Sequence, residues 1–126
     1  METDQITELI IGASFEVMNE LGAGFLEKVY ENALLAELKE HSIFAEQQKE
    51  ICVWYKNNRV GTYLADLVVE NSVIVELKAV NKLDAVHSAQ LINYLRASDF
   101  ETGLLINFGN PRVEIKRLFN KISSRE

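Results

Sequence analysis

Two charged residues interrupt the most β-rich stretch of this 126-residue chain. Residues 73–78 (VIVELK) are dominated by β-branched and other apolar side chains, which is typical of a strand. Alternation along a strand places Glu76 and Lys78 on the same face as Ile74. Charged side chains rarely occupy a central strand unless they are paired or bind a metal ion. Glu76 and Lys78 are therefore candidates for chemistry.

Asp66, ten residues before Glu76, is a third candidate. If the chain turns at residues 70–72 with Val69 opposite Val73, Asp66 falls directly across from Glu76. Two facing carboxylates repel each other and destabilise a sheet. A divalent cation between them makes the interaction favourable.

An alternative needs no metal. Asp66, Glu76 and Lys78 could face solvent or form an ion-pair network with a purely structural role, since exposed strand faces are common. Alternation alone favours this structural interpretation over a metal site.

The composition excludes other kinds of metal site. Cys52 is the only cysteine and there are two histidines, so a zinc cage of thiolates and imidazoles is not expected. The 19 acids favour hard ions such as Mg²⁺ or Mn²⁺. The net charge of −6 argues against a general nucleic-acid binder, although acids around a bound metal lose part of that charge. A single cysteine fits the cytoplasm, and no apolar run is long enough to predict a membrane span.

Hydrophobic periodicity predicts the elements that position these residues. We expect one domain over residues 1–126, of mixed α/β class, with a central mixed sheet flanked by helices and the acids at one edge. The apolar residues of the second helix form its inner stripe, namely Leu26, Val29, Tyr30, Ala33, Leu34 and Leu38. Trp54 and Tyr55 could stack on bases, but ordinary strand packing is favoured. The predicted helices are 3–21, 25–40 and 83–97, and the predicted strands are 50–55, 60–69, 73–78, 102–108 and 113–118.

The spacing of these candidates resembles that of a known superfamily. Asp66, then nine residues, then Glu76-Leu77-Lys78 resembles the D…ExK signature of the PD-(D/E)XK nuclease superfamily, with Ala65 where proline is frequent. Three further segments in the same order resemble the GxxExxY proteins, and the resemblance runs from about residue 6 to residue 119. These segments are 24–30 (GFLEKVY), 90–95 (QLINYL) and 104–109 (LLINFG).

The resemblance implies a role for each matching residue. Asp66 and Glu76 would be the central metal ligands, with Glu27 contributed by the helical region and the backbone carbonyl oxygen of Leu77 completing the set. Lys78 would orient the attacking water or stabilise negative charge growing on the phosphate.

Gln90 and Tyr94 match the Q-x-x-x-Y element of RecB-like nucleases. The resemblance implies that they assist at the active site and contact the substrate strand. Because they lie four residues apart, both project from one helix face.

The function implied is metal-dependent hydrolysis of phosphodiester bonds in nucleic acid, with DNA favoured and Mg²⁺ or Mn²⁺ as the cofactor. The alternative is a non-cleaving module of the same fold that binds nucleic acid or protein within a larger complex. A nuclease of this size is expected to act as a homo-oligomer or with a partner protein that supplies specificity.

Overall fold

The computed structural model describes residues 1–120. The order of elements, two helices, three strands, a helix and two strands, agrees with the sequence prediction. β1 begins five residues before the predicted strand, because residues 45–49 (AEQQK) lack the apolar alternation that marks a strand. The elements are α1 (Thr3–Leu21), α2 (Glu27–Glu40), β1 (Ala45–Tyr55), β2 (Asn58–Val69), β3 (Val73–Lys78), α3 (Ala85–Ala97), β4 (Thr102–Asn107) and β5 (Glu114–Phe119).

The five strands form one mixed sheet in the order β1-β2-β3-β4-β5. Neighbouring strands are antiparallel except β3 and β4, which are parallel. A parallel pair needs a crossover connection, and α3 provides it. Since Asp66 and Glu76 belong to the second and third strands in this order, the expected placement at a sheet edge is wrong.

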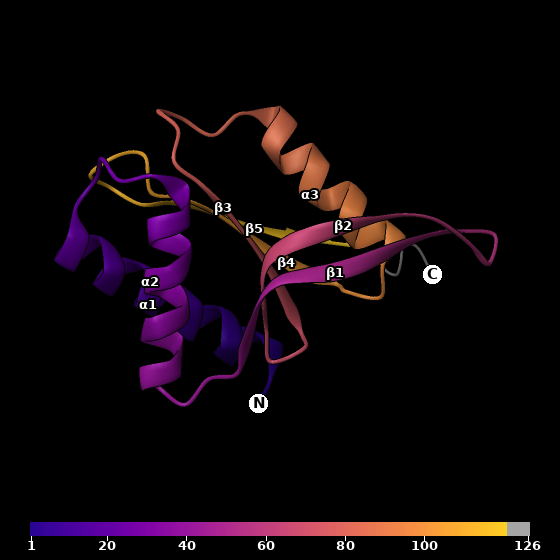
Figure 1. Cartoon of the computed structure of the whole chain (residues 1–126), viewed down its shortest axis with the longest axis horizontal. Helices are drawn as coiled ribbons and strands as arrows, with labels where there is room; N and C mark the ends of the chain where they lie inside the picture. Colours follow the sequence, from indigo (N-terminus) through magenta and orange to yellow (C-terminus); the bar gives the residue numbers. More distant parts are fainter. Residues whose placement is uncertain (121–126) are drawn as a thin grey trace.

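The sheet separates two apolar cores (Figure 1). α1 and α2 cover one face, and α3 covers the other. Val73, Val75 and Leu77 pack toward α1 and α2, whereas Ile74 packs toward α3, which confirms the predicted alternation in β3. Among residues 1–120, no helix is long and apolar enough to cross a membrane.

The start of α2 differs from the prediction. Leu26 and Val29 are exposed rather than part of the inner stripe. Leu26 is the N-cap of α2 in extended backbone, so the helical period does not yet apply to it. Tyr30, Leu34 and Leu38 are buried, which confirms the rest of the predicted stripe.

The hairpin of β1 and β2 extends far beyond the rest of the sheet (Figure 1). β3 pairs with β2 only from Leu67 to Val69, and residues 54–62 are all exposed. The predicted packing of Trp54 and Tyr55 is therefore wrong: 54% and 60% of their surfaces are exposed. The alternation that predicted this strand is real, but no layer covers its distal half.

Candidate functional site

Asp66 and Glu76 meet where β2 and β3 separate. Val69 lies opposite Val73 as predicted, and the backbone pairing ends at Leu67 and Val75. At the next position, side chains replace the backbone ladder. The Asp66 N–H donates to Glu76 Oε2 (2.9 Å), and the Leu77 N–H donates to Asp66 Oδ2 (2.8 Å). Each carboxylate is thus fixed by the backbone of the opposite strand.

This arrangement perturbs the ionisation of Glu76. Burial, followed by the negative charge of Asp66, raises the pKa of Glu76 to about 8. The Asp66 N–H and the charge of Lys78 act in the opposite direction. Two close carboxylates that cannot both ionise easily are a common feature of functional sites. Added positive charge between them would favour the doubly ionised pair.

Glu27 and Lys78 belong to the same electrostatic neighbourhood. The pKa of the Glu27 carboxyl is raised by partial burial and then by Asp66, while Lys78 lowers it. Lys78 therefore acts on both Glu27 and Glu76. None of the ion pairs within residues 1–120 includes Lys78, which leaves its ammonium group available to an anionic ligand.

The segment GFLEKVY fixes the start of α2. The buried Tyr30 hydroxyl donates to the Gly22 carbonyl oxygen (2.6 Å) and accepts from the Phe25 N–H (3.2 Å). Gly22 and Gly24 both have positive φ, a conformation that favours glycine. Tyr30 thus ties down the loop from which Glu27 begins the helix.

A second segment, LLINFG, holds the chain directly after Lys78. The buried Asn107 side chain accepts from the Val80 N–H (3.0 Å) and donates to the Val80 carbonyl oxygen (2.8 Å). A Cβ at Gly109 would lie 2.0 Å from that same oxygen, so only glycine fits there. Phe108 stacks on Tyr30 with ring centroids 4.7 Å apart. The two segments therefore pack against each other, one containing Glu27 and the other holding the residues that follow Lys78.

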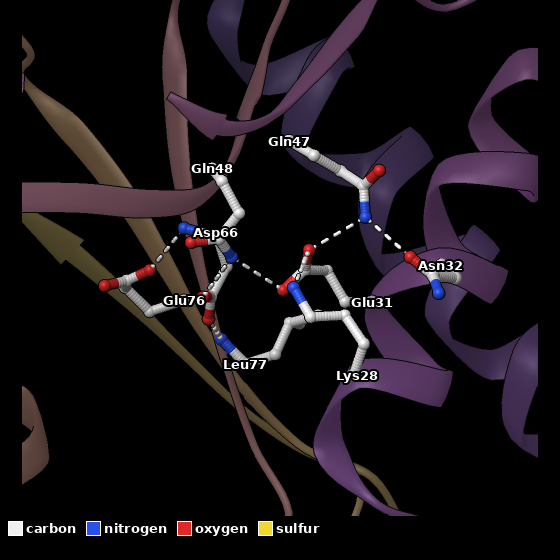
Figure 2. A network of polar contacts seen from close by, with 8 residues as sticks. All are labelled: Lys28, Glu31, Asn32, Gln47, Gln48, Asp66, Glu76 and Leu77. Carbon is white, nitrogen blue, oxygen red and sulfur yellow. Dashed lines mark hydrogen bonds and ion pairs between the residues drawn. The ribbon is translucent and has the colours of Figure 1, made fainter. Parts of the chain in front are cut away.

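Figure 2 shows a polar network that joins Asp66 to α2. Gln48 Nε2 donates to Asp66 Oδ1 (3.2 Å) and to Glu31 Oε1 (3.0 Å). Glu31 is buried, and its other oxygen accepts from Gln47 Nε2 (2.8 Å) and Lys28 Nζ (3.0 Å). Gln48 has a φ of +49°, a left-handed conformation that is strained for this residue type.

Sequence reasoning missed Glu31 and Gln48. Glu31 lies four residues after Glu27, on the same helix face, and this spacing was an available signal. Gln48 gave none, because its contact with Asp66 depends on the local backbone of β1.

Gln90 and Tyr94 lie on α3, on the other side of the acids. Gln90 Nε2 donates to Tyr94 Oη (3.3 Å), so the two share a helix face as predicted. Tyr94 stacks on Tyr63 of β2, with ring centroids 3.6 Å apart. Glu76 and Asp66 help to raise the pKa of Tyr63, after burial as the main cause. Tyr63, another residue that the sequence did not single out, thus connects the Gln90–Tyr94 pair to the acids.

The oxygen donors at this site fit a hard divalent cation that takes few ligands from the protein and keeps several waters. Within residues 1–120, no group of three or more histidine, cysteine, aspartate or glutamate side chains is placed to hold a metal ion. Mg²⁺ commonly binds through one or two carboxylates and keeps several waters. Asp66, Glu76 and a backbone carbonyl meet that requirement, and the role of Glu27 as a direct ligand stays a prediction.

Comparisons with known proteins agree with this geometry. Residues 4–118 match the sequence model of the PD-(D/E)XK nuclease superfamily. No curated protein sequence matches the chain. The crystal structure of SSO0001 is similar, with a TM-score of 0.54 and 20% identity over 74% of this chain and 50% of that chain. At this identity the likeness shows the fold alone, and the chain spans half the length of that protein.

Proposed function

Since the chain belongs to the PD-(D/E)XK nuclease superfamily, we propose that it is a metal-dependent nuclease that hydrolyses phosphodiester bonds, with DNA as the favoured substrate. One observation carries this proposal. Asp66 and Glu76 come from two strands that separate at these residues, and Lys78 follows on the same strand as Glu76. Acids that only stabilised the fold would be expected to pair with cations rather than with each other.

We further propose that the chain belongs to the GxxExxY group of this superfamily and acts in the cytoplasm. Support for the group comes from Tyr30 and Gly24, whose hydrogen bonds and backbone conformation give the motif a physical purpose. The single cysteine supports a reducing compartment.

We assign Asp66, Glu76 and the Leu77 carbonyl oxygen as the residues that would hold Mg²⁺ or Mn²⁺, with Glu27 as an additional acid. When bound, the ion would supply a water of lowered pKa and offset negative charge on the phosphate. Lys78 would donate to the phosphate oxygens as negative charge grows on them.

Gln90 and Tyr94 are assigned to the substrate side of the site. Gln90 is exposed, and its amide can contact a phosphate or a sugar. Tyr94 is held by its stack on Tyr63 and would keep Gln90 in place.

The test is a cleavage assay on labelled single- and double-stranded DNA and RNA, with Mg²⁺, with Mn²⁺ and with chelator. Wild type should cleave at least one substrate only with metal, and Glu76→Gln should not. Glu16→Gln, which changes an exposed acid on α1, is the matched control and should behave as wild type.

Binding without cleavage by wild type under all conditions would replace this proposal with the non-cleaving module. Cleavage by Glu76→Gln equal to that of wild type would show that the activity arises elsewhere.

A further inference from the structure

The distal half of the β1–β2 hairpin has a composition unlike that of the rest of the chain. Residues 51–65 contain Lys56 and Arg59 and no acid, although the chain as a whole carries a net charge of −6. Trp54, Tyr55 and Val60 are each more than half exposed in this segment. Large exposed apolar side chains next to cations mark an interaction surface.

The cations at the tip are poorly compensated. Arg59 pairs with Glu50 at 2.8 Å, but both side chains are more than half exposed, so this pair contributes little to stability and can exchange for another anion. Lys56 Nζ lies 5.3 Å from the centroid of the Tyr55 ring and belongs to none of the ion pairs within the described residues. A ring beside a cation is how proteins combine base stacking with phosphate binding.

The hairpin is continuous with the acidic site. β2 runs without interruption from the tip at Asn58 to Asp66, eight residues that span about 27 Å at the usual rise of a strand. The base of the hairpin is held in place because Tyr63 stacks on Tyr94 of α3. The tip thus extends away from the rest of the sheet and is joined to Asp66 by one continuous strand (Figure 1).

We propose that residues 54–59 form a binding arm for an unpaired nucleic-acid strand that passes around the hairpin tip. Trp54 and Tyr55, which alternation places on opposite faces of β1, each stack on a base, and Lys56 and Arg59 contact phosphates. This inference rests on the proposed nuclease function. At about 3.4 Å per stacked nucleotide, the arm contacts the strand no more than about eight nucleotides from the phosphate at Asp66 and Glu76.

The experiment compares cleavage and binding by wild type and two arm variants, Trp54→Ala/Tyr55→Ala and Lys56→Gln/Arg59→Gln. The matched controls are Phe15→Ala and Lys39→Gln. They change exposed residues on α1 and α2, outside the hairpin. Substrates are single strands that extend 4 or 12 nucleotides past the cleaved bond. Binding is measured by fluorescence anisotropy in Ca²⁺ over a range of salt concentrations.

Wild type and both controls should bind and cleave the longer strand better than the shorter one. Since each stacked ring contributes about 5-fold or more, loss of both aromatics should weaken binding of the longer strand by about 25-fold or more. Loss of both cations should reduce the slope of log affinity against log salt by about 1.4. Both arm variants should cleave the shorter strand as wild type does.

Three outcomes would overturn the proposal in distinguishable ways. If wild type cleaves and the arm variants match the controls on both strands, the arm assignment is wrong and the nuclease function stands. If wild type neither binds nor cleaves any strand, both proposals fail. If the arm variants bind normally but lower the molar mass measured by light scattering, the tip contacts a second copy of the chain instead.

Discussion

The side-chain amide of Gln48 lies between two carboxylate environments, which differ in whether the acids have hydrogen-bond donors and cations as partners or another acid. On one side of Gln48, Glu31 is buried and receives hydrogen bonds from a lysine and two glutamines. On the other side, Asp66 lies against a second acid, Glu76, whose pKa is raised to about 8. The first environment is complete as the protein stands. In the second, added positive charge would favour the two ionised carboxylates, and this is the basis of the proposed metal site.

The largest expected effect that separates the two environments is the pH dependence of stability. In the folded state the pKa of Glu76 rises from its ordinary 4.5 to about 8, so between these values the folded protein binds more protons than the unfolded chain. In chelator, the contribution of Glu76 to the free energy of unfolding should therefore be most favourable below about pH 4.5. It should fall as the pH rises toward 8. At about 1.36 kcal/mol per unit, the loss is roughly 5 kcal/mol at most.

Urea denaturation of wild type and Glu76→Gln at pH 5, 7 and 9 measures this effect. Glu76→Gln keeps an acceptor for the Asp66 N–H but carries no charge. It should remove most of the slope and be more stable than wild type at pH 9. Equal slopes for the two proteins would mean that the pKa of Glu76 is not raised in the folded state.

The next largest effect is on cleavage, which should distinguish Glu76 from Glu31. Residues that only orient metal ligands commonly contribute 10- to 100-fold to activity, so loss of Glu76, a proposed ligand, should cost more than about 100-fold. Glu31→Gln should cost less, since it acts on Asp66 only through Gln48. The ratio of kcat/KM to that of wild type at saturating Mn²⁺ is the measurement. A larger loss in Glu31→Gln than in Glu76→Gln would reverse the assignment of the two acids.

Metal binding should stabilise wild type by about 2.7 kcal/mol when the ion is present at 100 times its dissociation constant. Glu31→Gln should retain most of this gain, because both acids of the pair remain. Glu76→Gln should lose it. Differential scanning calorimetry in chelator and in millimolar Mn²⁺ checks this, and an equal shift in Glu76→Gln and wild type would place the ion at another site.

Much of the sheet and of the acid pair was predictable from sequence. The run of β-branched residues in β3 and the short turn before it are local signals, and they were sufficient to place Val69 opposite Val73. Since a register fixed at one pair extends along both strands, it also brought Asp66 next to Glu76.

The burial of Glu31 and its hydrogen bonds were not predictable in this way. The burial of Glu31 depends on how α2 docks against β1, and periodicity assigns a helical glutamate to the surface. The exposure of Trp54 and Tyr55 was missed for the converse reason. Alternation predicts a strand, but whether a further layer covers that strand is a tertiary property.

The Glu31 environment itself should contribute a smaller amount to stability. Glu31→Ala removes a buried acceptor from Gln47, Gln48 and Lys28, although each of these can turn toward another partner or water. We expect a loss of about 1–3 kcal/mol in the free energy of unfolding. Urea denaturation in chelator at pH 7, with Glu16→Ala as the exposed control, provides the measurement. A loss no larger than that of the control would mean that the network adds nothing to the fold.

The smallest change in stability is expected for Gln48→Gly, which removes the side chain between Glu31 and Asp66. Glycine adopts a φ of +49° without strain, which should recover about 1–2 kcal/mol. The substitution also removes the amide that contacts Glu31 and Asp66, at a similar cost because these hydrogen bonds are partly exposed. The net effect on the free energy of unfolding should stay within about 1 kcal/mol of zero. Activity should nevertheless fall by about 10-fold or more, since Asp66 loses the group that orients it.

The matched control is Ser42→Gly, which relieves a similar φ of +59° in the exposed connection between α2 and β1. It should leave kcat/KM unchanged. If Gln48→Gly were clearly more stable than wild type and equally active, the strain at Gln48 would have no role in the site. Glu31 would then have no effect on Asp66. If instead stability is unchanged and activity falls, the strained conformation is maintained because it holds Gln48 between Glu31 and Asp66. Glu31 is then a positioning residue for Asp66 as well as a structural one.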